Sequence, residues 1–308
     1  MRYSSFTNQL LALPAEQREN IKNLLHSQLS APASMRSNLD TLWEDFYDLA
    51  DENFVSEFAR KPNDRAWEMQ LGVALRRAGL KLEGRKPGPD FLTSDGKNRV
   101  WIEAVVAEPG DAADAVPSAE FITLVNAPED QIIFRITNAL NYKMRQLKKH
   151  IAAGIVENGD RYVIALCASI PNHLVTSYHA IRAVYGIGGW QFDRDPETSE
   201  VIAGHLASKR EVHKVSGAPV STDAFLSPAW SRVSGLLFAA GPFATDLSLL
   251  GNGFTTLHNF SAQFPLRTGW LRFHSEYRIE EREGVQHLAR SYGKPSVRLP
   301  SYEAVENL

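Results

Sequence analysis

The spacing of apolar residues along the chain predicts a helical N-terminal part followed by a mixed α/β part. Over residues 5–58 apolar side chains recur every three or four positions between polar ones, which is the periodicity of helices. Pro32 and the polar stretch 30–37 predict a break between two helical segments. Residues 1–60 are therefore predicted to form a helical arm or cap.

The period changes after residue 62, where a helix and short strands are expected. Asn63 or Asp64 is a suitable N-cap for a helix that runs to residue 78 and stops at Gly79. Short apolar runs then predict three strands, and Asp95-Gly96 predicts a hairpin turn at 94–97. The predicted strands are residues 80–83, 90–93 and 99–106.

A long amphipathic helix and a buried strand complete this part of the chain. Helical periodicity spans residues 129–153 and ends at Gly154, and the apolar run 162–168 follows. The order is thus helix, three strands, helix, strand. Cys167 lies in the last run and is the one cysteine of the chain, so it has no partner for an internal disulfide and is expected to be inert packing.

The C-terminal half is expected to extend the same sheet. A helix is predicted at 174–185 and a turn or loop at 186–196, because the glycine-rich segment there lacks a preceding buried strand and a following Gly-Lys-Ser/Thr. Further strands are predicted at 233–240, 254–258 and 270–273. The predicted fold is α/β with a mixed sheet, divided into an arm (1–60), a core (61–170) and an extension packed on the core (171–308).

Composition and charge narrow the class of protein only a little. The chain has 308 residues, of which 44% are hydrophobic and 22% charged, as expected for a globular protein with a packed core. Its 33 basic and 36 acidic residues give a net charge of −3, which by itself does not demand a nucleic-acid partner. No signal-peptide pattern or membrane-length apolar window is present, so a cytoplasmic protein without a membrane partner is expected.

Three acidic residues stand where a divalent metal ion could bind. Asp90 follows Pro89 at the start of a predicted strand, and Glu103 lies inside the apolar strand that follows the hairpin turn. Strand alternation puts Trp101, Glu103 and Val105 on one face, where an unpaired ionised glutamate would be costly. A metal ion held by both carboxylates would offset that cost; a structural salt bridge to a basic side chain is the alternative.

Glu68 and Lys143 add two further candidates. Glu68 lies on an edge of the helix predicted at 63–78 together with apolar residues. It is expected either to assist the metal site or to form an ion pair with Arg65 or Arg76. Lys143 interrupts the apolar stripe of the long helix and is expected to point at the sheet, either into a site or as a lysine at the rim of the core. The stripe consists of Ile132, Ile136, Leu140, Lys143, Leu147 and Ile151. Arg135, Tyr142 and Gln146 fall on an adjoining edge and are expected to line the same cleft, with Arg135 and Gln146 as candidates for binding nucleic acid.

With these elements in this order, the segment 63–168 resembles the PD-(D/E)xK nuclease superfamily, which has the restriction-endonuclease-like fold. The resemblance rests on Glu68, Pro89-Asp90 and Ile102-Glu103-Ala104. It implies that Asp90 and Glu103 hold Mg²⁺ or Mn²⁺, with Glu68 assisting through water. The family's lysine two residues after the second acid is Val105 here, and Lys143 matches the relocation of that cation to the second core helix in some members.

The implied function is metal-dependent hydrolysis of nucleic-acid phosphodiester bonds, with DNA favoured as the partner and with a role in DNA repair, restriction or antiviral defence. Double-strand cutting commonly uses two symmetric sites, so a homodimer is compatible with it. Because Val105 replaces the motif lysine, the alternative is a catalytically inactive nuclease-like scaffold, in which Glu103 pairs with Lys143 and the chain binds nucleic acid or a protein.

Overall fold

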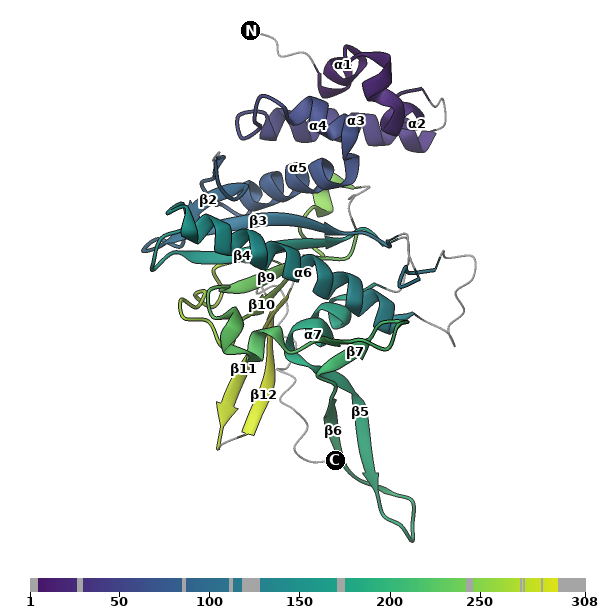
Figure 1. Ribbon diagram of the computed structural model, residues 1–308, viewed down its shortest axis with the longest axis vertical. Helices are drawn as coiled ribbons and strands as arrows, with labels where there is room; N and C mark the ends of the chain where they lie inside the picture. The colour runs from purple at the N-terminus through teal and green to yellow at the C-terminus, as the bar shows by residue number, and fades with distance from the viewer. Residues whose placement is uncertain are drawn as a thin grey trace.

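The computed structural model shows a mixed α/β protein with a large central sheet (Figure 1). It describes residues 5–26, 30–84, 87–110, 113–117, 128–170, 175–241, 246–271, 273, 275–283 and 285–292. The helices of this part are α1 (Phe6–Leu11), α2 (Lys22–His26), α3 (Ser30–Phe46), α4 (Phe54–Arg60), α5 (Pro62–Arg77), α6 (Glu129–Ala152) and α7 (Ser177–Tyr185). None of them is both long and apolar enough to cross a membrane.

Eight strands form the central sheet in the order β1-β2-β3-β4-β9-β10-β11-β12. These strands are β1 (Glu83–Gly84), β2 (Phe91–Ser94), β3 (Arg99–Ala107), β4 (Arg161–Ala168), β9 (Gly235–Ala239), β10 (Thr255–His258), β11 (Ser275–Arg282) and β12 (Val285–Tyr292). β1, β2 and β3 pair antiparallel, whereas β3, β4 and β9 run parallel. The C-terminal half therefore extends the sheet of the core, as predicted from the sequence.

Helices cover both faces of the sheet, and strand alternation decides which residues meet which layer. On β3, Val100 and Ile102 join the core formed with α5 and the N-terminal helices. Trp101 belongs to the opposite core, which α6 and α7 cover. Glu103 shares the parity of Trp101 and so faces α6. The predicted alternation of β3 is confirmed.

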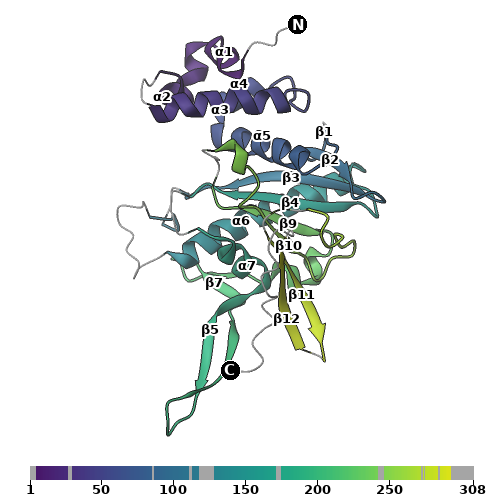
Figure 2. The ribbon, with the colours of Figure 1, turned by 180° about the vertical axis from the view of Figure 1, so that it is seen from behind.

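The N-terminal helices form a cap over α5 and share its hydrophobic core (Figures 1 and 2). Phe6 contacts Trp43 with ring centroids 4.8 Å apart, and Phe46 meets Phe91 of β2 at 6.3 Å. The predicted break at 30–37 is wrong, because α3 runs unbroken from Ser30 to Phe46. Pro32 lies in its first turn, where a missing N–H removes no intrahelical hydrogen bond.

Helix α5 lies against the sheet, and its N-cap comes two residues before Asn63 and three before Asp64, the two candidate caps. Pro62 is its first residue and Lys61 its N-cap, so Asn63 and Asp64 lie inside the first turn. The helix ends as predicted, with Gly79 following at φ +90°. It is held to the sheet by Trp67, whose Nε1 donates to the carbonyl of Ala165 in β4 at 3.0 Å.

Helix α6 has the predicted bounds and the predicted buried stripe. It spans Glu129–Ala152 and is followed by Gly154 at φ +70°. Lys143 is buried among the apolar residues of the stripe. Among the strands, the predicted segment 80–83 shrinks to the two residues of β1, and the hairpin turn shifts to 95–98. Cys167 is fully buried in β4, and burial raises the pKa of its thiol to about 12, as expected for an inert cysteine.

Two predictions for the C-terminal half are wrong. The expected loop at 186–196 is strand β5 (Ile187–Arg194), which pairs with β6 (Val201–Ser208) in a ribbon that projects from the body (Figures 1 and 2). The expected strand at 270–273 is absent from its described residues, and the next strand begins at Ser275. α7 starts at Ser177 after the N-cap Thr176, whereas the expected start at Leu174 lies outside the described residues. A second short ribbon pairs β7 (Glu211–His213) with β8 (Pro219–Ser221).

Candidate active site at the open edge of β3

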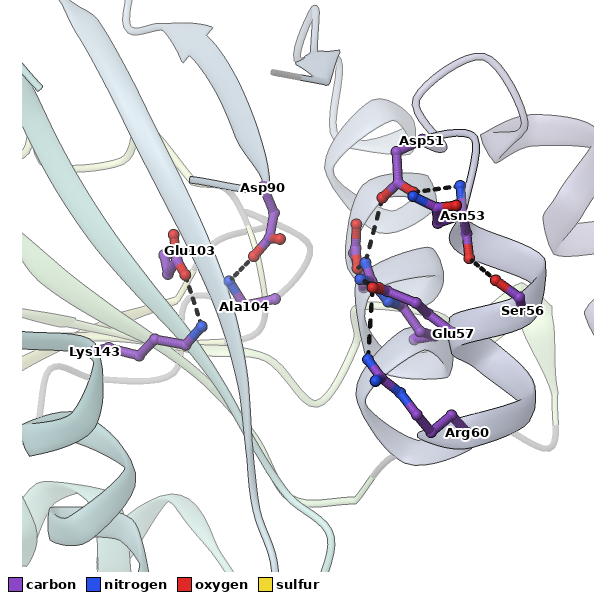
Figure 3. Close-up of polar contacts among 11 residues, drawn as sticks. Asp51, Asn53, Ser56, Glu57, Arg60, Asp90, Glu103, Ala104 and Lys143 are labelled. Atoms are coloured by element: carbon purple, nitrogen blue, oxygen red, sulfur yellow. Dashed lines mark hydrogen bonds and ion pairs between the residues drawn. The ribbon is translucent and has the colours of Figure 1, made fainter. Parts of the chain in front are cut away.

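The candidate site lies where β3 extends beyond its neighbour β2. The last pair between them is Phe91 with Ile102, whereas β3 pairs with β4 on its other side as far as Ala107. Among the described residues, no strand covers residues 103–107 on the β2 side. Asp90 precedes β2, and its Oδ2 accepts a hydrogen bond from the Ala104 amide at 2.7 Å (Figure 3). The carboxylate thus caps a backbone donor that the sheet leaves open.

Glu103 and Lys143 meet in a buried ion pair across the layer between β3 and α6. Lys143 Nζ lies 2.7 Å from Glu103 Oε1, and the two side chains are only 11% and 7% exposed (Figure 3). The lysine that interrupts the apolar stripe of α6 therefore points at the acid that interrupts the apolar strand. Each is the charge partner that makes burial of the other tolerable.

The electrostatics of this pair favour a further cation. Burial, then the charge of Asp90, raise the pKa of Glu103 from 4.5 to about 7, although Lys143 opposes the shift. Burial would lower the pKa of Lys143, but the charges of Glu103 and Asp90 outweigh it and raise that pKa. Lys143 thus stays charged, but its single ammonium group faces two carboxylates, those of Asp90 and Glu103.

The second oxygen of Glu103 is buried and poorly satisfied. Glu103 Oε2 has no hydrogen bond of ordinary geometry within the described part of the chain, and neither has the buried hydroxyl of Tyr162, which interacts with the same carboxylate. His150, two turns after Lys143 on α6, places Nε2 3.9 Å from Oε2. Burial, then the positive charge of Lys143, lower the pKa of His150, so a neutral imidazole faces this oxygen near neutral pH.

These side chains open into a pocket of about 350 Å³ between the sheet and the cap. Figure 3 shows Asp90, Glu103 and Lys143 on one side and Glu57 and Arg60 of α4 on the other. The lining residues are Glu57, Arg60, Lys61, Asp64, Arg65, Glu68, Asp90, Glu103, Ala104, Val105, Tyr142, Lys143 and Gln146. The structure therefore brings the four predicted site residues to one cavity, namely Glu68, Asp90, Glu103 and Lys143.

Glu68 lines this pocket but is engaged by the cap. It forms an ion pair with Arg65, which also pairs with Glu57 and lies 3.8 Å from Asp51. The other partner considered, Arg76, pairs with Asp48 instead. Glu68 therefore belongs first to the ion-pair cluster that ties α4 to α5.

Asp64 is, with Glu57, one of two acids of the pocket that were not predicted from the sequence. It was considered as an N-cap, yet it lies one turn before Glu68 on the same face of α5, and both line the cavity. Burial is the main cause that raises the pKa of its carboxyl, and the charges of Asp90 and Lys143 reach it too. The spacing of four residues to Glu68 is the signal that would have found it.

Of the two candidates for nucleic-acid binding, only Gln146 is among the lining residues. Its Nε2 donates to the Tyr142 hydroxyl at 3.0 Å. Arg135, about three turns before Gln146 on α6, donates from Nε to the carbonyl of Glu108 at 2.7 Å and is not among the described residues that line the pocket. Arg135 therefore holds the segment after β3 by this hydrogen bond. The prediction that Arg135 lines the cleft is wrong.

The donor set suits a hard divalent cation with few protein ligands. No three His, Cys, Asp or Glu side chains among the described residues are close enough to form a complete metal cage. Mg²⁺, however, commonly keeps several waters and uses one or two carboxylates together with substrate phosphates. Asp90 and Glu103 supply two neighbouring carboxylates, and the poorly satisfied Oε2 of Glu103 is a buried acceptor that such an ion would satisfy.

Comparison with known proteins adds no assignment: no protein-family model, curated protein or solved structure matches this chain.

Proposed function

We propose that the chain is a metal-dependent nuclease that hydrolyses phosphodiester bonds at the open edge of β3. The observation that carries the proposal is the convergence of Asp90, Glu103 and Lys143 in one pocket from the segment before β2, from β3 and from α6. The helix-strand order α5-β1-β2-β3-α6-β4 is similar to that of the PD-(D/E)xK nucleases and supports the same function.

Asp90 and Glu103 would hold Mg²⁺ or Mn²⁺. Such an ion lowers the pKa of a bound water and neutralises charge that develops on phosphate. Lys143 places its ammonium at the same carboxylate from α6 and so supplies the cation that Val105 does not. In this role it favours the ionised form of Glu103 and puts positive charge beside the phosphate. Asp64 and Glu68 are the acids available at the α5 wall to accept bonds from ordered water.

A nuclease-like scaffold without catalysis is the second candidate, and one observation favours it. Glu103 Oε1 is already neutralised by Lys143 at 2.7 Å, so the carboxylate has a partner without any metal ion. In that case Glu103 and Lys143 form a structural pair that joins α6 to the sheet, and the chain acts by binding nucleic acid or protein. The two functions differ in metal affinity.

The test is a cleavage assay of the full chain on plasmid DNA, single-stranded DNA and RNA with Mn²⁺ or Mg²⁺. We expect cutting that chelation by EDTA abolishes and that Glu103→Gln, a substitution of nearly equal volume, reduces at least about 100-fold. Glu44→Gln, at an exposed position of α3, is the matched control and should cut like the parent.

Calorimetric titration with Mn²⁺ separates the two candidates. The nuclease requires binding that is lost in Glu103→Gln and retained in Glu44→Gln. Absence of both cutting and metal binding in the folded parent would refute the nuclease and leave the scaffold.

A further inference from the structure

Helix α6 carries charge of one sign along the side that leads away from the pocket. Its two acids, Glu129 and Asp130, occupy the first turn, and no acid follows in the remaining 22 of its 24 residues. The basic residues of that stretch are Arg135, Lys143, Arg145, Lys148, Lys149 and His150. Arg145 and Lys149 are exposed and lie one and two turns beyond Tyr142 on one face. A helix face of this kind attracts a polyanion.

Tyr142 presents an aromatic ring to solvent at the rim of the pocket. It is 49% exposed although it lines the same cavity as Glu103 and Lys143. Its hydroxyl accepts a hydrogen bond from Gln146, and Lys143 Nζ and Arg145 Cζ lie 5.7 Å and 5.9 Å from the ring centroid. The ring is thus held in place beside the candidate metal ligands by two cations and an amide, while about half of its surface remains free.

We propose that the substrate is single-stranded nucleic acid and that Tyr142 stacks on an unpaired base next to the phosphate in the pocket. This inference rests on the proposed function. In a duplex the bases are stacked on one another, so no base face is free to stack on an exposed ring beside the scissile phosphate. An unpaired base offers its π-face, and a basic groove with aromatic platforms is how single strands are commonly held.

The opposite wall of the pocket fits the same substrate. Arg60 and Lys61, at the junction of α4 and α5, are exposed cations that line the cavity across from α6. A strand that lies along Arg145 and Lys149 would therefore have Arg60 and Lys61 across the pocket, where Arg60 also lies 3.6 Å from Glu57. Residues of α4 in the cap form one wall of the pocket. Its volume of about 350 Å³ is at the small end of the usual range for ligand sites.

The experiment measures binding separately from cutting. Fluorescently labelled oligonucleotides of about 15 residues, poly-dT, poly-rU and a blunt hairpin duplex, are titrated with the full-length Glu103→Gln protein and followed by anisotropy. We expect the single strands to bind more tightly than the hairpin, and the dT and rU arms to distinguish DNA from RNA. Tyr142→Ala should weaken single-strand binding about tenfold and leave the hairpin unchanged.

Two further variants separate stacking from a structural effect. Tyr142→Trp keeps a π-face and should bind single strands within about twofold of the parent affinity. Tyr47→Ala, at an exposed tyrosine of the cap outside the pocket, should leave that affinity unchanged.

Arg145→Ala should lower the slope of log affinity against log salt by about 0.7, the value for one phosphate contact with a single strand.

Equal binding of hairpin and single strand, or unchanged single-strand affinity in Tyr142→Ala, would overturn the inference. If the parent still cuts duplex DNA with metal in that case, the nuclease stands and only the substrate class fails. If single strands bind in a Tyr142-dependent way but nothing is cut, hydrolysis fails and the single-strand site stands.

Discussion

Substitution of Glu103 by glutamine tests the electrostatics of the pocket without any substrate. The pKa of Glu103 is raised from 4.5 to about 7 in the folded protein, chiefly by burial and then by Asp90. The folded state therefore binds a proton that the unfolded state has released between these two values. Stability attributable to this carboxyl consequently falls as the pH rises from about 4.5 to about 7, and the penalty is fully present above that window.

The size of the effect follows from the shift. A difference of about 2.5 pKa units corresponds to about 3 kcal/mol, at roughly 1.4 kcal/mol per unit. Glutamine has nearly the same shape but does not titrate, so the variant escapes this penalty. Relative to the parent, Glu103→Gln should become more stable by about 3 kcal/mol as the pH rises from about 4.5 to 8. In the parent Lys143 stays charged, because the charges of Glu103 and Asp90 raise its pKa against burial; in Glu103→Gln only Asp90 of these two charges remains beside it.

The assay is urea unfolding of both proteins in EDTA, followed by tryptophan fluorescence at several pH values in that range. Carboxyl groups remote from the pocket titrate alike in both proteins and cancel in the difference. Glu44→Gln, at an exposed position, controls for the change of net charge. A difference between Glu103→Gln and the parent that stays constant over the whole range would refute the reasoning, because it would mean that Glu103 titrates with an ordinary pKa.

Two further predictions concern the attachment of the cap and of α5. Arg65→Ala removes an ion-pair partner of the buried carboxylate of Glu68 and should lower the free energy of unfolding by about 3 kcal/mol. Arg60→Ala, whose side chain is 68% exposed, should cost less than about 1 kcal/mol. Equal losses in urea unfolding would contradict this. Trp67→Phe removes the bond to the Ala165 carbonyl and leaves a buried acceptor, which should cost about 1–3 kcal/mol in the same measurement. No loss there would mean that another donor replaces the indole.

Much of the core was predictable because its signals are local. Gly79 and Gly154 mark helix ends at the expected places, and the alternation of β3 put Glu103 on the face that meets α6. Lys143 was conspicuous because it interrupts a regular apolar stripe. Each of these depends on the few residues around it, so the sequence suffices to find them.

Other features were decided by packing between distant segments. The ribbon at 187–208 was not foreseen, because its strands are stabilised by pairing with each other across a turn rather than by an apolar run. Arg65 rather than Arg76 pairs with Glu68, since α4 brings further acids to the Arg65 side of α5.

The sequence by itself determined which residues interrupt apolar patterns, namely Glu103 and Lys143, and hence where a site was to be sought. Only the tertiary structure decided that these two charges meet, that β2 ends short of Glu103 and leaves the edge of β3 open, and that Asp64 lines the same cavity. The physical reason is that periodicity is a property of neighbouring residues, whereas contact across 40 positions is set by how whole helices pack on the sheet.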